Sequence, residues 1–263
     1  MADWIGINRR ARRCYGFDEV ALVPGSVTVN PNEVDTSFSI GKHTFNVPIL
    51  AASMDGVVDV NFAIAMGKLG GIAVLNLDGI QTRYDNPNKI LDQIAKASPE
   101  EATNLVQSLY DHKKFPVKDK LIAKRVAEIK KAKVPVVVSC IPQNAEHFAK
   151  IAHDAGADIF IVQSTVATVR HLATEYKILD IEKFFKKTKM PVIIGNAVTY
   201  DMTLELMEIG ASGILVGIGP GAACTSRGVL GIGVPQITAT VDCAAARDYY
   251  FKRKGKYIPI ITD

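Results

Sequence analysis

The chain lacks the usual marks of disulfide-rich, zinc-binding and membrane proteins. Its four cysteines lie far apart, and no two of them have the CxxC spacing, which argues against a disulfide framework and a zinc site. No apolar run reaches the ~18 residues of a membrane span, and no secretory signal opens the sequence, so we expect a cytoplasmic protein with no membrane partner. The net charge of +4 over 263 residues gives no indication of nucleic-acid binding, but it is compatible with a phosphorylated substrate.

Short apolar segments alternate with amphipathic ones along most of the chain. Strands are expected at residues 47–53, 71–75, 134–140, 158–162, 191–195, 213–218 and 257–262. Helices are expected at 61–69, 120–131, 145–155, within 167–187, and at 200–209 and 236–254. Continuously apolar strands alternating with helices are typical of a parallel sheet covered by helices. We therefore predict an α/β fold, an incomplete (β/α)8 TIM barrel with about seven of its eight units present.

Two segments interrupt this alternation. Residues 1–46 are expected to be irregular apart from a hairpin at 36–45, and the polar segment 77–118 to contain two helices, 89–97 and 99–112. Segment 77–118 is too short for a separate domain, so residues 1–263 form one barrel domain whose C-terminal part is expected to be missing. An open seven-stranded sheet is the alternative, and it leaves two exposed edges.

A glycine-rich stretch with a single cysteine is the strongest chemical signal. It runs from Gly213 through Gly217, Gly219 and Gly221 to Cys224, which is followed by Thr225-Ser226-Arg227. Glycines allow backbone groups to converge closely, and neighbouring donors and a positive charge favour a nucleophilic thiolate. Local chemistry alone leaves open a tight strand-to-helix turn with a half-buried structural cysteine.

Polar or reactive residues follow several of the predicted strands. They are Ser53, Met54, Gln163, Asn196, Cys224 and Asp263. Barrel enzymes place their chemistry on these loops. Each has a plainer alternative at this stage: Met54 could pack in the core, Asn196 could cap the next helix, and Asp263 could be a surface carboxylate.

Several motifs resemble those of the IMP dehydrogenase/GMP reductase family, and in particular its IMP-dehydrogenase-related subgroup without a regulatory module. The longest is Gly-Ile-Gly-Pro-Gly-x-x-Cys-Thr-Ser-Arg at 217–227, followed by Gly-Ile-Gly-Val-Pro-Gln at 231–236. Shorter matches lie at 15–24, 48–55, 195–199 and 260–263. IMP dehydrogenases of the family commonly carry a paired regulatory module near 77–118, and here the segment leaves no room for one.

The resemblance implies a purine nucleotide oxidoreductase. Cys224 would attack C2 of a 6-oxopurine 5′-monophosphate, and hydride would pass to NAD or NADP. IMP dehydrogenase, which converts IMP, NAD and water to XMP and NADH, is the leading interpretation. A GMP reductase, which converts GMP and NADPH to IMP and ammonia, or an inactive truncated homologue, are the alternatives. As it stands, the chain is expected to bind nucleotide weakly and to turn over negligibly, and the full-length form to be a homotetramer.

The resemblance also assigns roles to individual residues. Ser226 takes the place of a catalytic threonine beside Cys224. The substrate-binding residues are Ser53, Met54, Asn196, Ala222 and Asp263, and the cofactor-binding residues are Gln163, Gly217, Ile218 and Gly219. The carbonyls of Gly219, Gly221 and Cys224 correspond to oxygens that hold a potassium ion in many family members.

Two departures from the family pattern leave the cofactor and the direction of reaction open. Ala222 stands where a serine usually contacts the nucleotide phosphate, and Gln163 where an aspartate lies near the nicotinamide ribose. A Rossmann dinucleotide loop at Gly217-Ile-Gly-Pro-Gly is a weaker interpretation, because the fingerprint requires a third glycine at position 222 and belongs to the first βα unit.

Overall fold

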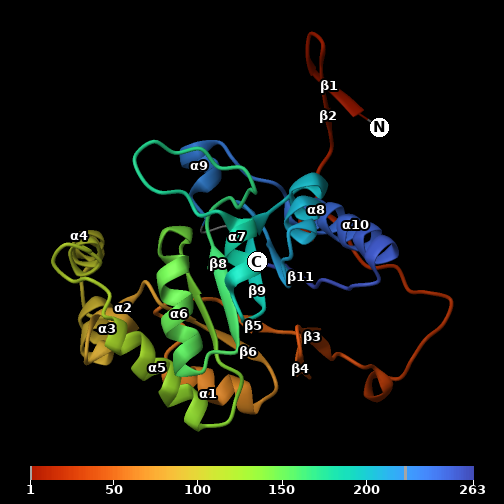
Figure 1. Ribbon diagram of the computed structural model, residues 1–263. Coiled ribbons are helices and arrows are strands. Elements are labelled where there is room, and N and C mark those ends of the chain that lie inside the picture. The colour runs from red at the N-terminus through yellow and green to blue at the C-terminus, as the bar shows by residue number, and fades with distance from the viewer. Residues whose placement is uncertain (1, 222–223) are drawn as a thin grey trace.

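Seven parallel strands form a curled half-barrel at the centre of the protein (Figure 1). The computed structural model describes residues 2–221 and 224–263. The strands are β5 (Leu50–Ala51), β6 (Ile72–Asn76), β7 (Val137–Cys140), β8 (Ile159–Gln163), β9 (Val192–Ala197), β10 (Gly213–Val216) and β11 (Ile260–Thr262). Each pairs with its neighbours in sequence, so β5 and β11 are the two edges. The prediction of an α/β barrel with about seven units is confirmed.

Helices cover the outer face of the sheet. They are α1 (Val60–Lys68), α5 (Asp119–Lys131), α6 (Ala145–Ala155), α7 (Ile181–Lys187), α8 (Tyr200–Glu208) and α10 (Gln236–Lys254). Several begin at a side chain that caps the first turn. Asp59 accepts from the amide of Phe62 at the start of α1, and Thr199 accepts from the amide of Met202 at the start of α8. Such caps satisfy amides that have no partner within the helix.

Both faces of the central strands β6 to β10 are buried, which explains their continuous apolar runs. In β6, Ile72 and Val74 belong to the cluster inside the half-barrel, whereas Ala73 and Leu75 belong to the cluster beneath the helices. The inner cluster is closed by a hairpin of β3 (Phe38–Ile40) and β4 (His43–Phe45), which contributes Ile40 and Phe45. The hairpin predicted at 36–45 is therefore present and caps the inner core.

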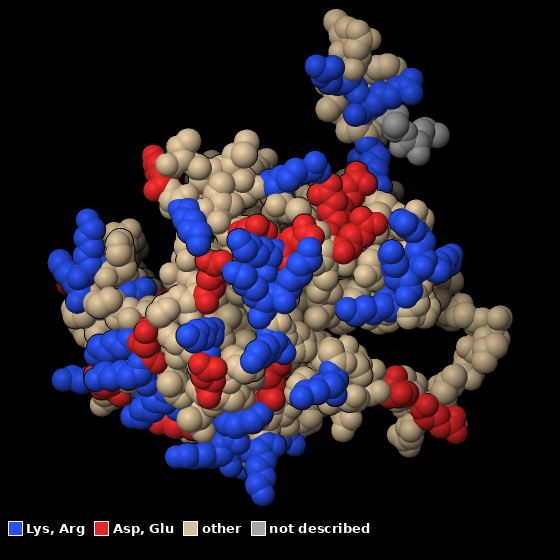
Figure 2. Space-filling model, in the orientation of Figure 1, with Lys and Arg blue, Asp and Glu red and all other residues tan. Residues whose placement is uncertain are grey.

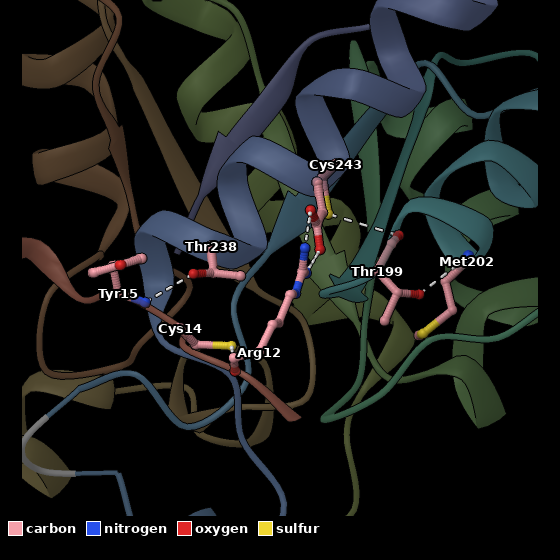
Figure 3. Close-up of polar contacts among 8 residues, drawn as sticks. Arg12, Cys14, Tyr15, Thr199, Met202, Thr238 and Cys243 are labelled. Atoms are coloured by element: carbon pink, nitrogen blue, oxygen red, sulfur yellow. Dashed lines mark hydrogen bonds and ion pairs between the residues drawn. The ribbon is translucent and has the colours of Figure 1, made fainter. Parts of the chain in front are cut away.

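The N-terminal segment contacts α10, a helix near the C-terminal end of the sequence. A second hairpin, β1 (Ala2–Gly6) and β2 (Arg9–Arg12), projects from the body (Figure 1). Arg12, the last residue of β2, pairs with Asp242 of α10. Just after the hairpin, the Tyr15 amide donates to Thr238 Oγ1 at 2.8 Å. The Thr238 amide donates back to the Tyr15 carbonyl at 3.3 Å. Figure 3 shows these contacts, which fasten the segment to the first turns of α10.

Residues 77–118 form a small helical lobe beside the sheet. It contains α2 (Ile80–Arg83), α3 (Pro87–Ala95) and α4 (Pro99–Leu109). The Arg83 guanidinium closes its base, since Nε donates to the Asp78 carbonyl at 2.9 Å and Nη1 donates to the Phe115 carbonyl. The two predicted helices are confirmed, and α2 is an additional short one.

Four details of the sequence prediction are wrong. The first strand occupies two residues instead of 47–53, because the following residues turn, with the Met54 amide donating to the Ala52 carbonyl. Between 167 and 187 only α7 is helical. Residues 1–46 contain the β1–β2 hairpin, and a short helix, α9 (Ser226–Leu230), follows the cysteine.

Charged side chains of both signs are interspersed over the face in Figure 2, and a group of basic side chains lies on the projecting hairpin and its base. Arg10 there stacks over the Trp4 ring at 4.3 Å. None of the helices in the described residues combines the length and the apolar character that a membrane crossing requires.

Candidate active site

A cleft of about 890 Å³ opens at the carboxyl ends of the strands. Its lining comes from all seven strands of the sheet or the residues that follow them, including Ser53, Asn76, Ser139, Gln163, Asn196, Gly217 and Asp263. Residues of the long loop 164–180 and residues 217–221 after β10 line it as well. The arrangement matches the expectation that chemistry gathers at this end of a barrel.

Cys224 lies on one wall with its side chain exposed to the cleft. Its Sγ donates to Ser226 Oγ at 3.4 Å, and its amide donates to the Gly221 carbonyl at 3.1 Å. The hydroxyl and amide of Ser226 lower the pKa of the Cys224 thiol, with smaller help from the Gly219 amide and the Arg227 charge. The half-buried structural alternative for Cys224 is therefore wrong, and the side chain has the setting of a nucleophile.

Two glycines of the turn before Cys224, Gly217 and Gly219, have positive φ and leave no free space for a side chain. Gly217 has φ +150°, and a Cβ on it would lie 2.3 Å from the Asp263 carbonyl oxygen. The chain after β11 thus passes directly against the turn after β10, which brings Asp263 beside the loop. Ile218, Gly219 and Gly221 line the cleft as well, whereas Ala222 lies outside the described residues.

Asn196 links the cysteine loop to Asp263. Its Nδ2 donates to the Gly217 carbonyl and to Asp263 Oδ2, each at 2.7 Å, and the residue is only 7% exposed. Thr199 caps α8, so the helix-cap alternative for Asn196 is wrong. Asp263 lines the cleft and takes part in this network, and it is more than a free surface carboxylate.

Ser53 and the next residue, Met54, take different positions relative to the cleft. Ser53 lines the cleft, and its Oγ donates to Gln163 Oε1 at 3.1 Å. The Met54 side chain is 58% exposed and does not line the cleft, so the core-packing alternative for this residue is wrong as well.

The far end of the cleft contains polar groups that sequence reasoning missed. Asp78 accepts from the Ile141 amide at 2.8 Å and from Asn144 Nδ2 at 2.5 Å, and burial raises the pKa of its carboxyl. His171 lines the cleft, with Nε2 2.9 Å from the Tyr176 hydroxyl. Helices were predicted within 167–187, so the part of the loop 164–180 from residue 167 on was not expected to line a cleft.

An exposed cysteine of lowered pKa at the carboxyl ends of a curled parallel α/β sheet is typical of a barrel-type enzyme site. Comparison with known proteins agrees: the family model for the IMP dehydrogenase/GMP reductase domain matches residues 14–263. The chain belongs to this family of oxidoreductases.

Individual relatives support the assignment. An uncharacterized oxidoreductase of Mycobacterium tuberculosis is 35% identical over 266 residues, covering 98% of this chain and 70% of the relative. The inosine-5′-monophosphate dehydrogenase of Cryptosporidium parvum is 32% identical over 253 residues, covering 94% of this chain and 60% of that protein. The crystal structure of an IMP dehydrogenase/GMP reductase-like protein from Corynebacterium glutamicum superimposes on the whole chain and 69% of its own, with a TM-score of 0.91 and 32% identity.

Proposed function

We propose that the protein is a purine nucleotide oxidoreductase of the IMP dehydrogenase type, with Cys224 as its nucleophile. The observation that carries the proposal is the exposed Cys224 thiol of lowered pKa, in a cleft that also contains Asn196, Asp263 and Gln163. Relatives named as oxidoreductases and IMP dehydrogenases add support. The reaction would convert IMP, NAD and water to XMP and NADH.

Chemistry at C2 of the purine requires a good nucleophile that later becomes a leaving group, and a thiolate fulfils both roles. The Cys224 thiolate adds to C2 of IMP, and the electron pair of the C2=N3 bond moves onto N3. C2 then loses its hydrogen as hydride, which restores the double bond and leaves a thioimidate on Cys224. A water oxygen adds to C2, one water proton goes to N3 and the other is released, and expulsion of the thiolate gives XMP. The nicotinamide cofactor, when bound, accepts the hydride.

The other residues of the cleft would bind and orient the substrate. Asp263 carries an acceptor suited to ribose hydroxyls, and Asn196 holds that carboxylate in place. Ser53 would contact the purine side, with Ala222 as a further substrate-contacting candidate, whereas Met54, which does not line the cleft, would not take part. Ser226 lies 3.4 Å from Cys224, where its hydroxyl can orient the attacking water.

The cleft also fits a dinucleotide cofactor, because it extends well beyond Cys224. Gln163 is at its floor and offers an amide to a ribose or carboxamide, whereas the turn Gly217-Ile218-Gly219 brings backbone close to the reacting centre. A potassium ion would use the carbonyls of Gly219, Gly221 and Cys224. The Gly221 carbonyl accepts the Cys224 amide, and its second lone pair can serve a hard cation.

GMP reduction is the second candidate, favoured by Gln163 in place of the family aspartate. A neutral amide there changes the contact to the nicotinamide ribose, and Ser226 could equally assist the departure of ammonia. An inactive homologue is the third, to be decided by the same experiment.

A paired spectrophotometric assay tests these proposals. IMP with NAD should generate reduced cofactor, and GMP with NADPH should leave its absorbance unchanged; the reverse pattern would identify a reductase. Cys224→Ala is the control and should abolish turnover. In parallel, IMP should slow alkylation of Cys224 by iodoacetamide, whereas AMP, which has no 6-oxo group, should not. If neither substrate pair changed the absorbance and IMP did not slow alkylation of Cys224, the result would contradict the family chemistry.

A further inference from the structure

The residue after Met54 is a buried carboxylate held by the helical lobe 77–118. Asp55 is 9% exposed, and its Oδ2 accepts a hydrogen bond from the hydroxyl of Tyr110, which follows α4. Its Oδ1 has no hydrogen-bond partner among the described residues. The single contact with Tyr110 is therefore the main polar attachment of this side chain, and losing it would leave a buried carboxylate unsatisfied.

The backbone of the lobe is shaped to admit this carboxylate. A Cβ on Gly79 would lie 2.1 Å from Asp55 Oδ2 and 2.3 Å from Oδ1, so the carboxylate packs directly on the glycine. Gly79 has φ −97°, which any residue adopts. The glycine is thus required for the space that Asp55 occupies and not for its backbone conformation.

Arg83 and Tyr110 form the rest of the contact. The Arg83 guanidinium lies 5.8 Å from the Tyr110 ring centroid, and it also ties Asp78 to Phe115 at the base of the lobe. Burial and the bond to Asp55 raise the pKa of the Tyr110 hydroxyl, so Tyr110 stays a neutral donor. The ring is thereby fixed against the base of the lobe, which is itself fixed to the sheet.

Asp55 lies two residues from the wall of the cleft. Ser53 lines that wall and bonds Gln163, and the Val57 and Val58 amides both donate to the Met54 carbonyl at 2.9 Å. Residues 53–58 thus form one compact turn whose buried anchor is Asp55. Any movement of that anchor moves Ser53 relative to Gln163.

We infer that Asp55 and Tyr110 are positioning residues, through which the helical lobe 77–118 holds the turn 53–58 at the edge of the substrate cleft. The lobe stands where members of the family commonly carry a regulatory module, and it holds the turn 53–58 in a fixed position. The inference concerns the same cleft as the proposed function, but the state of the turn can be measured without nucleotide, so the two stand or fall separately.

Hydrogen–deuterium exchange of the peptide 52–58, measured in the absence of ligand, tests whether the lobe holds this turn in place. Tyr110→Phe should speed exchange of the Val57 and Val58 amides about tenfold, since it removes a hydrogen bond to a charged group. Gly79→Ala should do the same by displacing the Asp55 carboxylate. The matched control is Tyr84→Phe, which removes a hydroxyl that bonds the Leu109 carbonyl at 2.9 Å in the same lobe.

The inference predicts that Tyr84→Phe leaves exchange of 52–58 at the wild-type rate. Equal acceleration by Tyr84→Phe and Tyr110→Phe would show general loosening of the lobe and overturn the inference, as would unchanged exchange in both Tyr110→Phe and Gly79→Ala. In the turnover assay, Tyr110→Phe should raise KM for the nucleotide several-fold while kcat changes little. A loss of kcat alone would contradict a positioning role for the Ser53 wall.

Discussion

Replacing Asn196 by alanine should destabilise the protein and weaken nucleotide binding together. Both hydrogens of its Nδ2 are used, one on the buried Gly217 carbonyl and one on Asp263. Losing the bond to Gly217 costs about 1 kcal/mol, and leaving that carbonyl buried without a partner adds about 1–2 kcal/mol. The bond to Asp263 adds less, since solvent reaches that carboxylate. The free energy of unfolding should therefore fall by about 2–3 kcal/mol.

Urea denaturation measures this difference, and Thr199→Ala is the matched control. Thr199 caps α8 three residues away, with Oγ1 3.3 Å from the Met202 amide, and loss of such a cap costs about 1 kcal/mol. We expect Asn196→Ala to be the more destabilising variant, with weaker protection of Cys224 by IMP. If Asn196→Ala proved no more destabilising than Thr199→Ala, the assignment of Asn196 as the link between the strand ends would be refuted.

Three further predictions concern the rest of the cleft. Ser226→Ala should raise the pKa of the Cys224 thiol and shift its rate of alkylation against pH upward; an unchanged profile would contradict the role of the hydroxyl. Gly217→Ala should destabilise the protein by about 2 kcal/mol or more in chemical denaturation, because its φ of +150° disfavours a side chain and a Cβ meets the Asp263 carbonyl. Burial raises the pKa of Asp78, so the folded state binds its proton more tightly than the unfolded state, and the contribution of Asp78 to stability should fall as pH rises through the raised pKa. Asp78→Asn should flatten that part of the stability profile; a profile as steep as that of the wild type would show that other groups cause it.

Much of the fold followed from the period of apolar residues. Continuous apolar runs such as 159–162 are buried on both faces and became strands, and the helices 145–155 and 236–254 have the bounds that their patterns predicted. The pattern failed at 167–180, where Leu172 suggests an apolar face. This residue is exposed on a loop, because the walls of a cleft need not follow the periodicity of the core.

The site was predicted less completely than the fold. Cys224 and Asp263 are prominent in sequence because they follow apolar strands. Asp55, Tyr110 and Asp78 act through contacts between distant residues: Asp55 and Tyr110 are 55 residues apart, and Asp78 lies 63 and 66 residues from Ile141 and Asn144. No short-range sequence pattern predicts such a contact, because only folding brings the two side chains together.

The attachment of the N-terminal segment to α10 sets an order of events during synthesis. Tyr15 and Thr238 are 223 residues apart in the chain, so their paired hydrogen bonds can form only after Thr238 has left the ribosome. Contacts of such long range close slowly, because loop-closure entropy must be overcome before they contribute. Until then residues 1–35 remain tethered but undocked, and a protease added to nascent chains should cleave there first.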